Sequence, residues 1–386
     1  MSRCHVLVIG AGLSGLCLAQ GLAAAGVSVA VYERDAAAGF RSQGYRVSLK
    51  PHGAQALRDC LPPHLFELCV ATSIRQATRM VFMDARLRPV FSRPVPPVAP
   101  GLAGFGVNRL TLREILLAGL EDMVCFGKAY ERFEPEGDSR VRALFSDGTT
   151  AVGDLLAGAD GTWSRVRAQL VPDAVVDELH WAVYGRTPIT GELLGQTPDV
   201  LVDTFNRVTG PAGAGISVAT CRAREPASQA AARLAPGVRL TDIPGYFSWT
   251  APLNDPSLSH ADPVSLHRAA LEIAGGFHPA LRRIVADADI PATFAVCVTS
   301  ARPVAAWNVP TVTLLGDAIH TMSPGRGDGA NIALKDAALL CGELRGAAAG
   351  RVGVGTAKAA YEADMLDYGF RAVADSLRRP FAPRPA

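Results

Sequence analysis

Several features that would assign this chain to a specialised class are missing from its 386 residues. Charges of one sign never form a run of five or six, and the formal net charge is +2, so no basic patch indicates a nucleic-acid partner. The 8 cysteines form no C-x-x-C pair and have no histidines at metal-ligand spacing, which argues against a metal site. We expect free thiols at apolar positions, and a reducing, cytoplasmic location is the default.

An uncharged run from Val6 to Tyr32 raises the alternative of a signal peptide or a membrane span. Five glycines interrupt this run, and they stand where a strand, turn, helix and second strand would need them. A membrane span would instead need a more continuous stretch of Leu, Ile and Phe. We therefore expect a soluble chain without a membrane span.

A glycine-rich turn follows the first predicted strand, His5 to Ile9. The turn reads Gly10-Ala11-Gly12-Leu13-Ser14-Gly15, and a predicted helix and a strand that ends at Glu33 follow it. In a G-x-G-x-x-G turn the first glycine permits the turn, the second lets a pyrophosphate approach, and the third allows close helix–strand packing. Helix N–H groups would hold the phosphates, and Glu33 would bind an adenosine ribose while disfavouring a 2′-phosphate. This segment predicts dinucleotide binding but does not choose between FAD and NAD(P).

A second glycine-rich loop stands near the C-terminus. The predicted strand 311–315 ends at Gly316-Asp317, and the loop 320–331 leads into a helix that ends near Leu344. Such a loop exposes backbone N–H groups to a flat or anionic ligand, and Asp317 could bind a polyol hydroxyl. The helix N-terminus would stabilise negative charge on a reduced flavin ring. An ordinary crossover loop is the alternative, which the length and composition of this segment disfavour.

The middle of the chain predicts two further elements of the site and a second domain. Asn108-Arg109 begins an amphipathic helix, where Arg109 would either clamp a phosphate or be solvated. A hairpin over 141–152 leads into a strand that stops at Asp160-Gly161. Short alternating stretches between about 171 and 300, interrupted by helices, predict a mixed or antiparallel sheet.

Taken together, these segments resemble the single-component FAD-dependent aromatic hydroxylases, the group A flavoprotein monooxygenases related to p-hydroxybenzoate hydroxylase. The first glycine turn with Glu33-Arg34 is similar to the family's ADP site. The segment 158–167 is similar to its DG fingerprint, which serves FAD and pyridine nucleotide, and 315–331 is similar to its GD motif. Arg109 stands where the family places a residue that reaches the FAD phosphates or ribityl chain, and Arg46 where an arginine often lies near the flavin.

The resemblance implies an α/β fold: a Rossmann-type FAD-binding domain with a parallel sheet, a substrate domain on a mixed or antiparallel sheet, and a C-terminal helix. We expect residues 1–75, 101–170 and 301–386 to form the first domain and 76–100 with 171–300 the second, without the thioredoxin-like tail of larger relatives. Arg46 and Pro324 are the catalytic candidates. The implied cofactor-binding residues are Gly10, Gly12, Leu13, Ser14, Gly15, Glu33, Arg34, Arg109, Asp160, Asp317, Pro324, Gly327, Gly329, Ala330 and Asn331.

The activity that the resemblance implies uses FAD, with NADPH or NADH as co-substrate, and O2. The enzyme would hydroxylate, epoxidise or Baeyer–Villiger oxidise an aromatic or polyketide-like hydrophobic small molecule through a flavin C4a-hydroperoxide. A monomer or homodimer is expected. One alternative is an FAD enzyme of this fold that inserts no oxygen, such as a dehydrogenase or cyclase, and another is a non-catalytic ligand-sequestering relative. For His320 we expect a structural, hydrogen-bonded role.

Overall fold

A computed structural model describes residues 4–37, 45–97, 104–210 and 214–378 of the chain. One half of the molecule, the first lobe, is built on a five-stranded sheet A in the order β17-β11-β1-β2-β7, and each neighbouring pair is parallel. Because β1, β11 and β17 are adjacent and parallel, the three loops that follow them leave the same edge of the sheet. The strands of sheet A are β1 (His5–Ile9), β2 (Ser28–Glu33), β7 (Val124–Phe126), β11 (Leu155–Gly158) and β17 (Val312–Leu314).

Helices cover one face of sheet A and a three-stranded antiparallel sheet covers the other. A Cβ added at Gly15 would lie 3.2 Å from Val8 Cγ1, and one at Gly153 would lie 2.8 Å from Leu7 Cγ. Since Leu7 and Val8 are consecutive in a strand, they point to opposite faces. The elements around these faces are α1 (Leu13–Ala24), α11 (Gly329–Ala348), α12 (Val354–Leu377), β8 (Tyr130–Glu136), β9 (Arg140–Phe145) and β10 (Thr150–Gly153).

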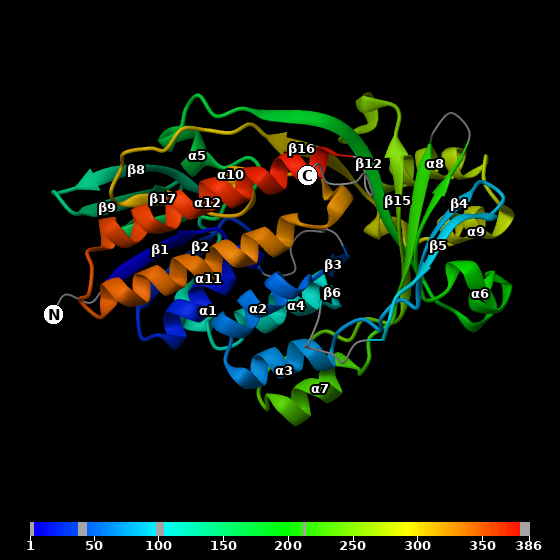
Figure 1. The fold of residues 1–386 in the computed structure, drawn as a ribbon, viewed down its shortest axis with the longest axis horizontal. Coiled ribbons are helices and arrows are strands. Elements are labelled where there is room, and N and C mark those ends of the chain that lie inside the picture. Colours follow the sequence, from blue (N-terminus) through cyan, green and yellow to red (C-terminus); the bar gives the residue numbers. More distant parts are fainter. Residues whose placement is uncertain (1–3, 38–44, 98–103, 211–213, 379–386) are drawn as a thin grey trace.

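The other half, the second lobe, is built on the seven-stranded sheet C in the order β16-β12-β15-β14-β13-β4-β5. Only β13 and β4 pair in parallel there, so the sheet is mixed. Figure 1 shows its strands between helices α8 and α9 on one side and the first lobe on the other. These elements are β4 (Arg79–Asp84), β5 (Pro89–Pro94), β12 (Val176–Pro188), β13 (Thr204–Thr209), β14 (Gly215–Cys221), β15 (Tyr246–Leu253), β16 (Phe294–Ala301), α8 (Pro263–Ala274) and α9 (Pro279–Ala286).

Short elements connect the two lobes. The antiparallel pair β3–β6 lies between them, and Asn108 of β6 donates a hydrogen bond to the Tyr246 hydroxyl of β15 at 2.9 Å. The remaining elements are β3 (Arg46–Ser48), β6 (Gly106–Asn108), α2 (Pro51–Cys60), α3 (Pro63–Ala71), α4 (Arg109–Leu117), α5 (Arg165–Leu170), α6 (Gly191–Gln196), α7 (Ala227–Leu234), α10 (Asp317–His320), and the 3-10 helices Glu121–Met123, Asp199–Leu201, Pro256–Leu258, Ile290–Ala292 and Pro324–Arg326.

The predicted fold class is confirmed: a parallel Rossmann-like sheet, a second mixed sheet and a long C-terminal helix are all present. Residues 79–94, in the segment expected in the second domain, form strands β4 and β5, which extend sheet C. One detail differs from the expectations. Helix α7 lies within the segment expected in the second domain, yet it packs against α3 and joins the hydrophobic core of the first lobe. In the described part of the chain, no helix has the length and apolar character to cross a membrane.

Candidate cofactor site

The loop between β1 and α1 combines two crowded glycines with one open glycine. Gly10 has φ +107°, and a Cβ there would lie 2.4 Å from the Ala159 carbonyl oxygen. A Cβ at Gly15 would lie 2.1 Å from the Gly10 oxygen. At Gly12, by contrast, a Cβ would have nothing within 4 Å. The backbone is therefore open at the N-terminus of α1, where unpaired N–H groups favour an anion.

Glu33 lies buried at the end of β2 and is tied to the glycine turn. Its Oε2 accepts a hydrogen bond from Ala11 N at 2.8 Å, and its Oε1 accepts one from Asp35 N at 2.9 Å. Arg113 of α4 lies 3.7 Å from the same carboxylate and donates to the Ala11 oxygen at 3.1 Å. Arg34 follows Glu33 and is exposed. The Glu33 carboxylate therefore lies beside the glycine turn, with the buried Arg113 guanidinium behind it.

Arg109 and Asp317 bring opposite charges to this edge of the sheet from separate loops. Arg109 begins α4 after β6, and Asp317 begins α10 after β17. Burial lowers the pKa of Arg109, the nearby Asp317 opposes that shift, and Arg113 adds to it. Neither Arg109 nor Asp317 makes a side-chain hydrogen bond to another described residue. The half-buried Arg109 guanidinium and the exposed Asp317 carboxylate are therefore available to bind a ligand.

The loop after β11 is held together by its own residues. Asp160 accepts hydrogen bonds from Ser164 Oγ at 2.6 Å and from Arg165 N at 2.8 Å, so its carboxylate caps α5. Burial raises the pKa of Asp160, and these hydrogen bonds oppose that rise. Buried Arg167 donates to the Ala318 oxygen at 2.7 Å and to the Thr162 oxygen at 2.8 Å. Through Arg167, the loop after β11 holds the loop that carries Asp317.

The loop after β17 rests on a buried carboxylate. Asp336 of α11 accepts hydrogen bonds from Gly316 N at 2.7 Å, from Tyr368 Oη at 2.6 Å and from His320 Nε2 at 2.6 Å. Burial lowers the pKa of His320, but the neighbouring Asp336 carboxylate outweighs it, so the pKa is raised overall. The hydrogen bond expected for His320 is present. This network fixes the backbone immediately before Asp317.

In the glycine-rich segment 324–331, the first residues are exposed, whereas the side chain of the last residue is buried. Pro324 is exposed, and Gly327 has φ +67° with nothing within 4 Å of an added Cβ. Gly329 and Ala330 begin α11 and are partly exposed. The fully buried Asn331 side chain accepts from Lys50 N at 2.7 Å and donates to the Gly327 oxygen at 2.8 Å. Asn331 can therefore reach a ligand only through its backbone.

Arg46 lies at the junction of the lobes. Its guanidinium lies over the Phe205 ring of β13, 5.6 Å from the ring centroid, and its Nε is buried without a hydrogen-bond partner. Arg46 pairs with Asn108 in the β3–β6 ladder, and Asn108 directly precedes Arg109 in the chain. Arg46 therefore lies between the Arg109–Asp317 region and sheet C.

These groups fit a flavin dinucleotide. The open Gly12 and the α1 N-terminus suit a diphosphate, and Arg109 adds a cation that has no counter-ion in hydrogen-bond contact among the described residues. Glu33 and Asp317 offer carboxylate oxygens suited to sugar and polyol hydroxyls. The α11 N-terminus adds N–H groups for partial negative charge.

Comparisons with known proteins agree with this fit. Residues 8–72 match the family model of the NAD(P)-binding Rossmann-like domain, and residues 277–375 match that of the FAD binding domain. A crystal structure from Photorhabdus luminescens, assigned as an FAD-containing monooxygenase, has 30% sequence identity and a TM-score of 0.82, with 97% of each chain covered. The chain belongs to the FAD-containing monooxygenases.

Two further proteins are similar to this chain, with lower coverage of their own length or lower sequence identity. A dual O-methyltransferase/FAD-dependent monooxygenase of Phaeosphaeria nodorum is 33% identical over 371 residues, which cover 87% of this chain and 39% of that protein. The chain therefore spans about two fifths of the length of the curated relatives it matches first. Klebsiella pneumoniae HpxO, crystallised with FAD and uric acid, shares the fold at 23% identity and a TM-score of 0.77, with 97% of this chain and 87% of that one covered.

Sequence reasoning missed three buried residues that support the site in this FAD-containing monooxygenase: Arg113, Arg167 and Asp336. Arg113 stands four residues after Arg109, so both face the same side of α4, and this spacing could have revealed it. Asp336 interrupts the apolar face of α11 between Ala333 and Leu340, which is a signal for a buried acid with partners. Arg167 is the last residue of the segment 158–167 that resembles the DG fingerprint, so the sequence already pointed to it, although it was not named as a site residue.

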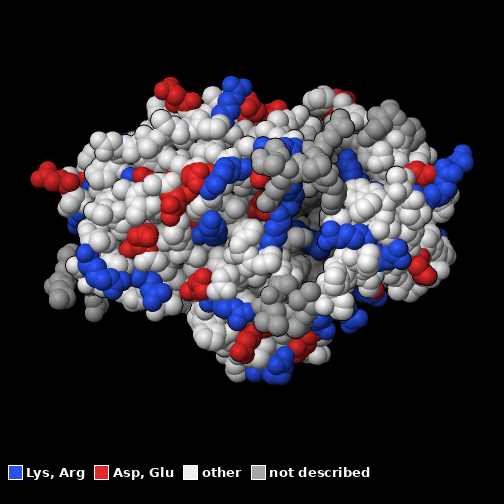
Figure 2. Space-filling model, in the orientation of Figure 1, with Lys and Arg blue, Asp and Glu red and all other residues white. Residues whose placement is uncertain are grey.

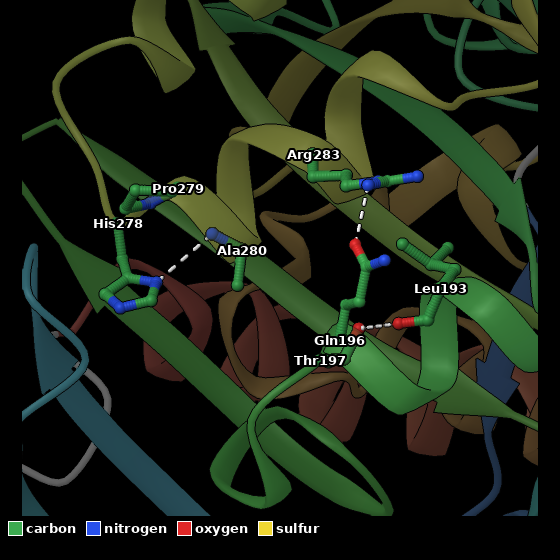
Figure 3. Close-up of a pocket in the computed structure, with 7 residues that line it drawn as sticks. All are labelled: Leu193, Gln196, Thr197, His278, Pro279, Ala280 and Arg283. Carbon is green, nitrogen blue, oxygen red and sulfur yellow. Dashed lines mark hydrogen bonds between the residues drawn. The ribbon is translucent and has the colours of Figure 1, made fainter.

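A hollow of about 250 Å³ in the second lobe lies away from this site (Figure 3). Its polar side chains already bond within the protein. Arg283 donates to Gln196 Oε1 at 2.6 Å, and His278 Nδ1 accepts from Ala280 N at 3.1 Å. This hollow, lined by α6 and α9, offers no open charge and is not a candidate for the cofactor.

Proposed function

We propose that the three loops at the edge of sheet A bind FAD, and that the chain uses NADPH or NADH and O2 to insert one oxygen atom into an aromatic or polyketide-like small molecule. The observation that carries this proposal is the convergence of Arg109 and Asp317 beside the open Gly12 backbone. The full-length similarity to an FAD-containing monooxygenase supports it. FAD would supply the redox chemistry by taking electrons from the nicotinamide and activating O2.

The residues of the chain divide the work of binding and orientation. Arg109 and the α1 N-terminus at Gly12, Leu13 and Ser14 would hold the diphosphate, and Glu33 with Arg34 the adenosine end. Asp317 would bind the ribityl hydroxyls. Among the remaining candidates, Asp160 acts by holding its loop, while Pro324, Gly327, Gly329, Ala330 and the backbone of Asn331 would line the flavin ring.

The second lobe would hold the substrate over that ring and exclude water. Arg46 lies between the two lobes, which suits contact with substrate or flavin. We keep the proposed division into a cofactor domain and a substrate domain, with α7 counted in the first by its packing. A cytoplasmic location and a monomer or homodimer also remain proposals; the eight free cysteines support a reducing compartment.

The test is a direct search for oxygen insertion. Purified protein is supplied with FAD, its flavin absorbance is measured, and NADPH and NADH oxidation is followed under ¹⁸O2 with phenolic and polyketide-like compounds. The proposal expects bound flavin, substrate-stimulated oxidation and one ¹⁸O atom in the product. Protein that binds no FAD refutes it. Bound flavin with an oxidised product free of ¹⁸O would favour the non-inserting alternatives instead.

A further inference from the structure

An acid stands at the start of α11, within the segment proposed to line the flavin ring. Asp328 directly precedes Gly329, the first residue of this 20-residue helix, and its side chain makes no hydrogen bond to the helix N–H groups. Those N–H groups carry partial positive charge, which favours an anion. An unpaired carboxylate at this position would cancel much of that charge, so Asp328 by itself opposes the binding of negative charge by α11.

Lys50 neutralises this carboxylate. Its Nζ donates to Asp328 Oδ1 at 2.5 Å, and its backbone N donates to Asn331 Oδ1 at 2.7 Å. Lys50 therefore holds the first turn of α11 at two points, through its side chain and through its backbone. The exposed fractions of the Lys50 and Asp328 side chains are 37% and 17%, so water screens their charges less than it screens charges at an open surface.

The packing of two helices fixes the position of Lys50. It directly precedes the first residue of α2, and a Cβ added at Gly53 of α2 would lie 2.1 Å from Asn331 Oδ1. The Asn331 amide donates in turn to the Ser48 and Gly327 oxygens, at 2.9 and 2.8 Å. The Lys50 backbone is therefore bound to the start of α11 independently of its ammonium group. A substitution of the Lys50 side chain changes a charge and leaves these contacts in place.

The charges around this pair are mainly positive. Burial lowers the pKa of His52 of α2, and the nearby Asp328 carboxylate opposes that shift. The ammonium groups of Lys50 and Lys335 lower the His52 pKa further. Figure 2 shows Lys and Arg side chains gathered along the hollow between the lobes. Among the described charged groups that shift the pKa of His52, Asp328 is the one acid, and Lys50 is its ion-pair partner.

We propose that Lys50 keeps the start of α11 electropositive by pairing with Asp328, and thereby sets how tightly the chain holds reduced FAD relative to oxidised FAD. A nicotinamide transfers a hydride, which is two electrons and one proton, so the reduced flavin ring carries a negative charge that the oxidised ring lacks. A positive potential at the helix start favours the charged form over the neutral form. Lys50 acts through Asp328 and not by contact with the flavin. This inference rests on the proposed function and adds a positioning residue to that site.

The experiment measures the Kd of oxidised FAD under air and of dithionite-reduced FAD under nitrogen, for the wild-type protein and its variants. The ratio of the two constants reports the preference for the charged form, and equilibration of the bound flavin with a redox dye reports it as a reduction potential. Lys50→Gln should shift the ratio about tenfold against reduced FAD, which lowers the potential of the two-electron couple by about 30 mV. Asp328→Asn should shift the ratio in the opposite direction, and the double variant should return to within about twofold of wild type.

Two controls separate the effect of charge from that of structure. Lys50→Arg keeps the charge and should keep the wild-type ratio. Arg88→Gln breaks the ion pair with Asp84 at the turn between β4 and β5 in the second lobe, and it should also leave the ratio unchanged.

The sign of the shift decides between the outcomes. If the ion pair only holds the loop in place, both single variants weaken oxidised and reduced FAD alike and the ratio stays at the wild-type value, which overturns the inference. A shift in the same direction in both single variants overturns it as well. Wild-type protein that binds no FAD refutes the proposed function, and the inference with it.

Discussion

The His320 Nε2 atom lies 2.6 Å from the Asp336 Oδ2 atom, and both side chains are fully buried. The same oxygen accepts a hydrogen bond from Gly316 N at 2.7 Å, while the other oxygen accepts one from Tyr368 at 2.6 Å. One carboxylate therefore joins α10, α11 and α12 directly behind the loop that presents Asp317. Buried polar networks of this kind are costly to break, because each partner is left without a substitute.

Asp336→Asn should lower the free energy of unfolding by about 3 kcal/mol, since it removes the charge that pairs with buried His320. Urea denaturation measures this change, and the amount of FAD retained after dialysis should fall as well. Asp364→Asn is the matched control, because Asp364 is exposed on α12. An Asp336→Asn variant as stable as the control would contradict the role given to the network.

The pH dependence of stability should reveal the same pair. Burial lowers the pKa of His320, but Asp336 raises it by more, so the folded protein binds this proton more tightly than the unfolded chain does. The contribution is fully present below the unfolded pKa of about 6.5 and is lost as the pH rises through the raised pKa. Relative to His320→Gln, wild-type stability should therefore decline as the pH rises above about 6.5. Parallel stability curves for the two proteins would contradict this assignment.

Two glycine substitutions should separate folding from cofactor binding. Gly15→Ala places a Cβ 2.1 Å from the Gly10 oxygen and should destabilise the fold by about 1–3 kcal/mol. Gly12→Ala places its Cβ in open space with φ −77°, so the FAD-free protein should keep its melting temperature. Because that space is where the diphosphate would lie, FAD binding should weaken at least tenfold. Unchanged FAD affinity in Gly12→Ala would refute this placement of the diphosphate.

Arg109→Gln and Asp317→Asn should each weaken FAD binding without unfolding the protein. Hydrogen bonds to charged groups contribute about 1.5–3 kcal/mol, which corresponds to roughly a tenfold to hundredfold rise in Kd. Fluorescence titration of the FAD-free protein measures Kd, and the melting temperature reports on folding. Arg345→Gln, at an exposed position of α11, should leave the Kd unchanged. A wild-type Kd in both site variants would remove these residues from the proposed site.

Local sequence patterns determined the strands, loops and helices that carry the motifs. The predicted strand His5–Ile9 coincides with β1, and the hairpin predicted over 141–152 is formed by β9 and β10. These elements follow from apolar periodicity and turn chemistry, which act over a few residues. Each of the three motifs begins where a predicted strand ends, so the motifs and their order were enough to predict the parallel sheet.

Only the tertiary structure decided which polar groups stay available to a ligand. The sequence presents Asn331 and Asp317 as equivalent polar residues of one motif. In the structure the Asn331 side chain is hydrogen-bonded to the Lys50 N–H and the Gly327 oxygen, whereas Asp317 is exposed. In the same way, Phe205 is exposed on the face of sheet C opposite α8 and α9, although Phe247 is core. Such differences depend on pairing between segments far apart in the chain, and on which face of a sheet a helix covers. Local spacing carries no information about either.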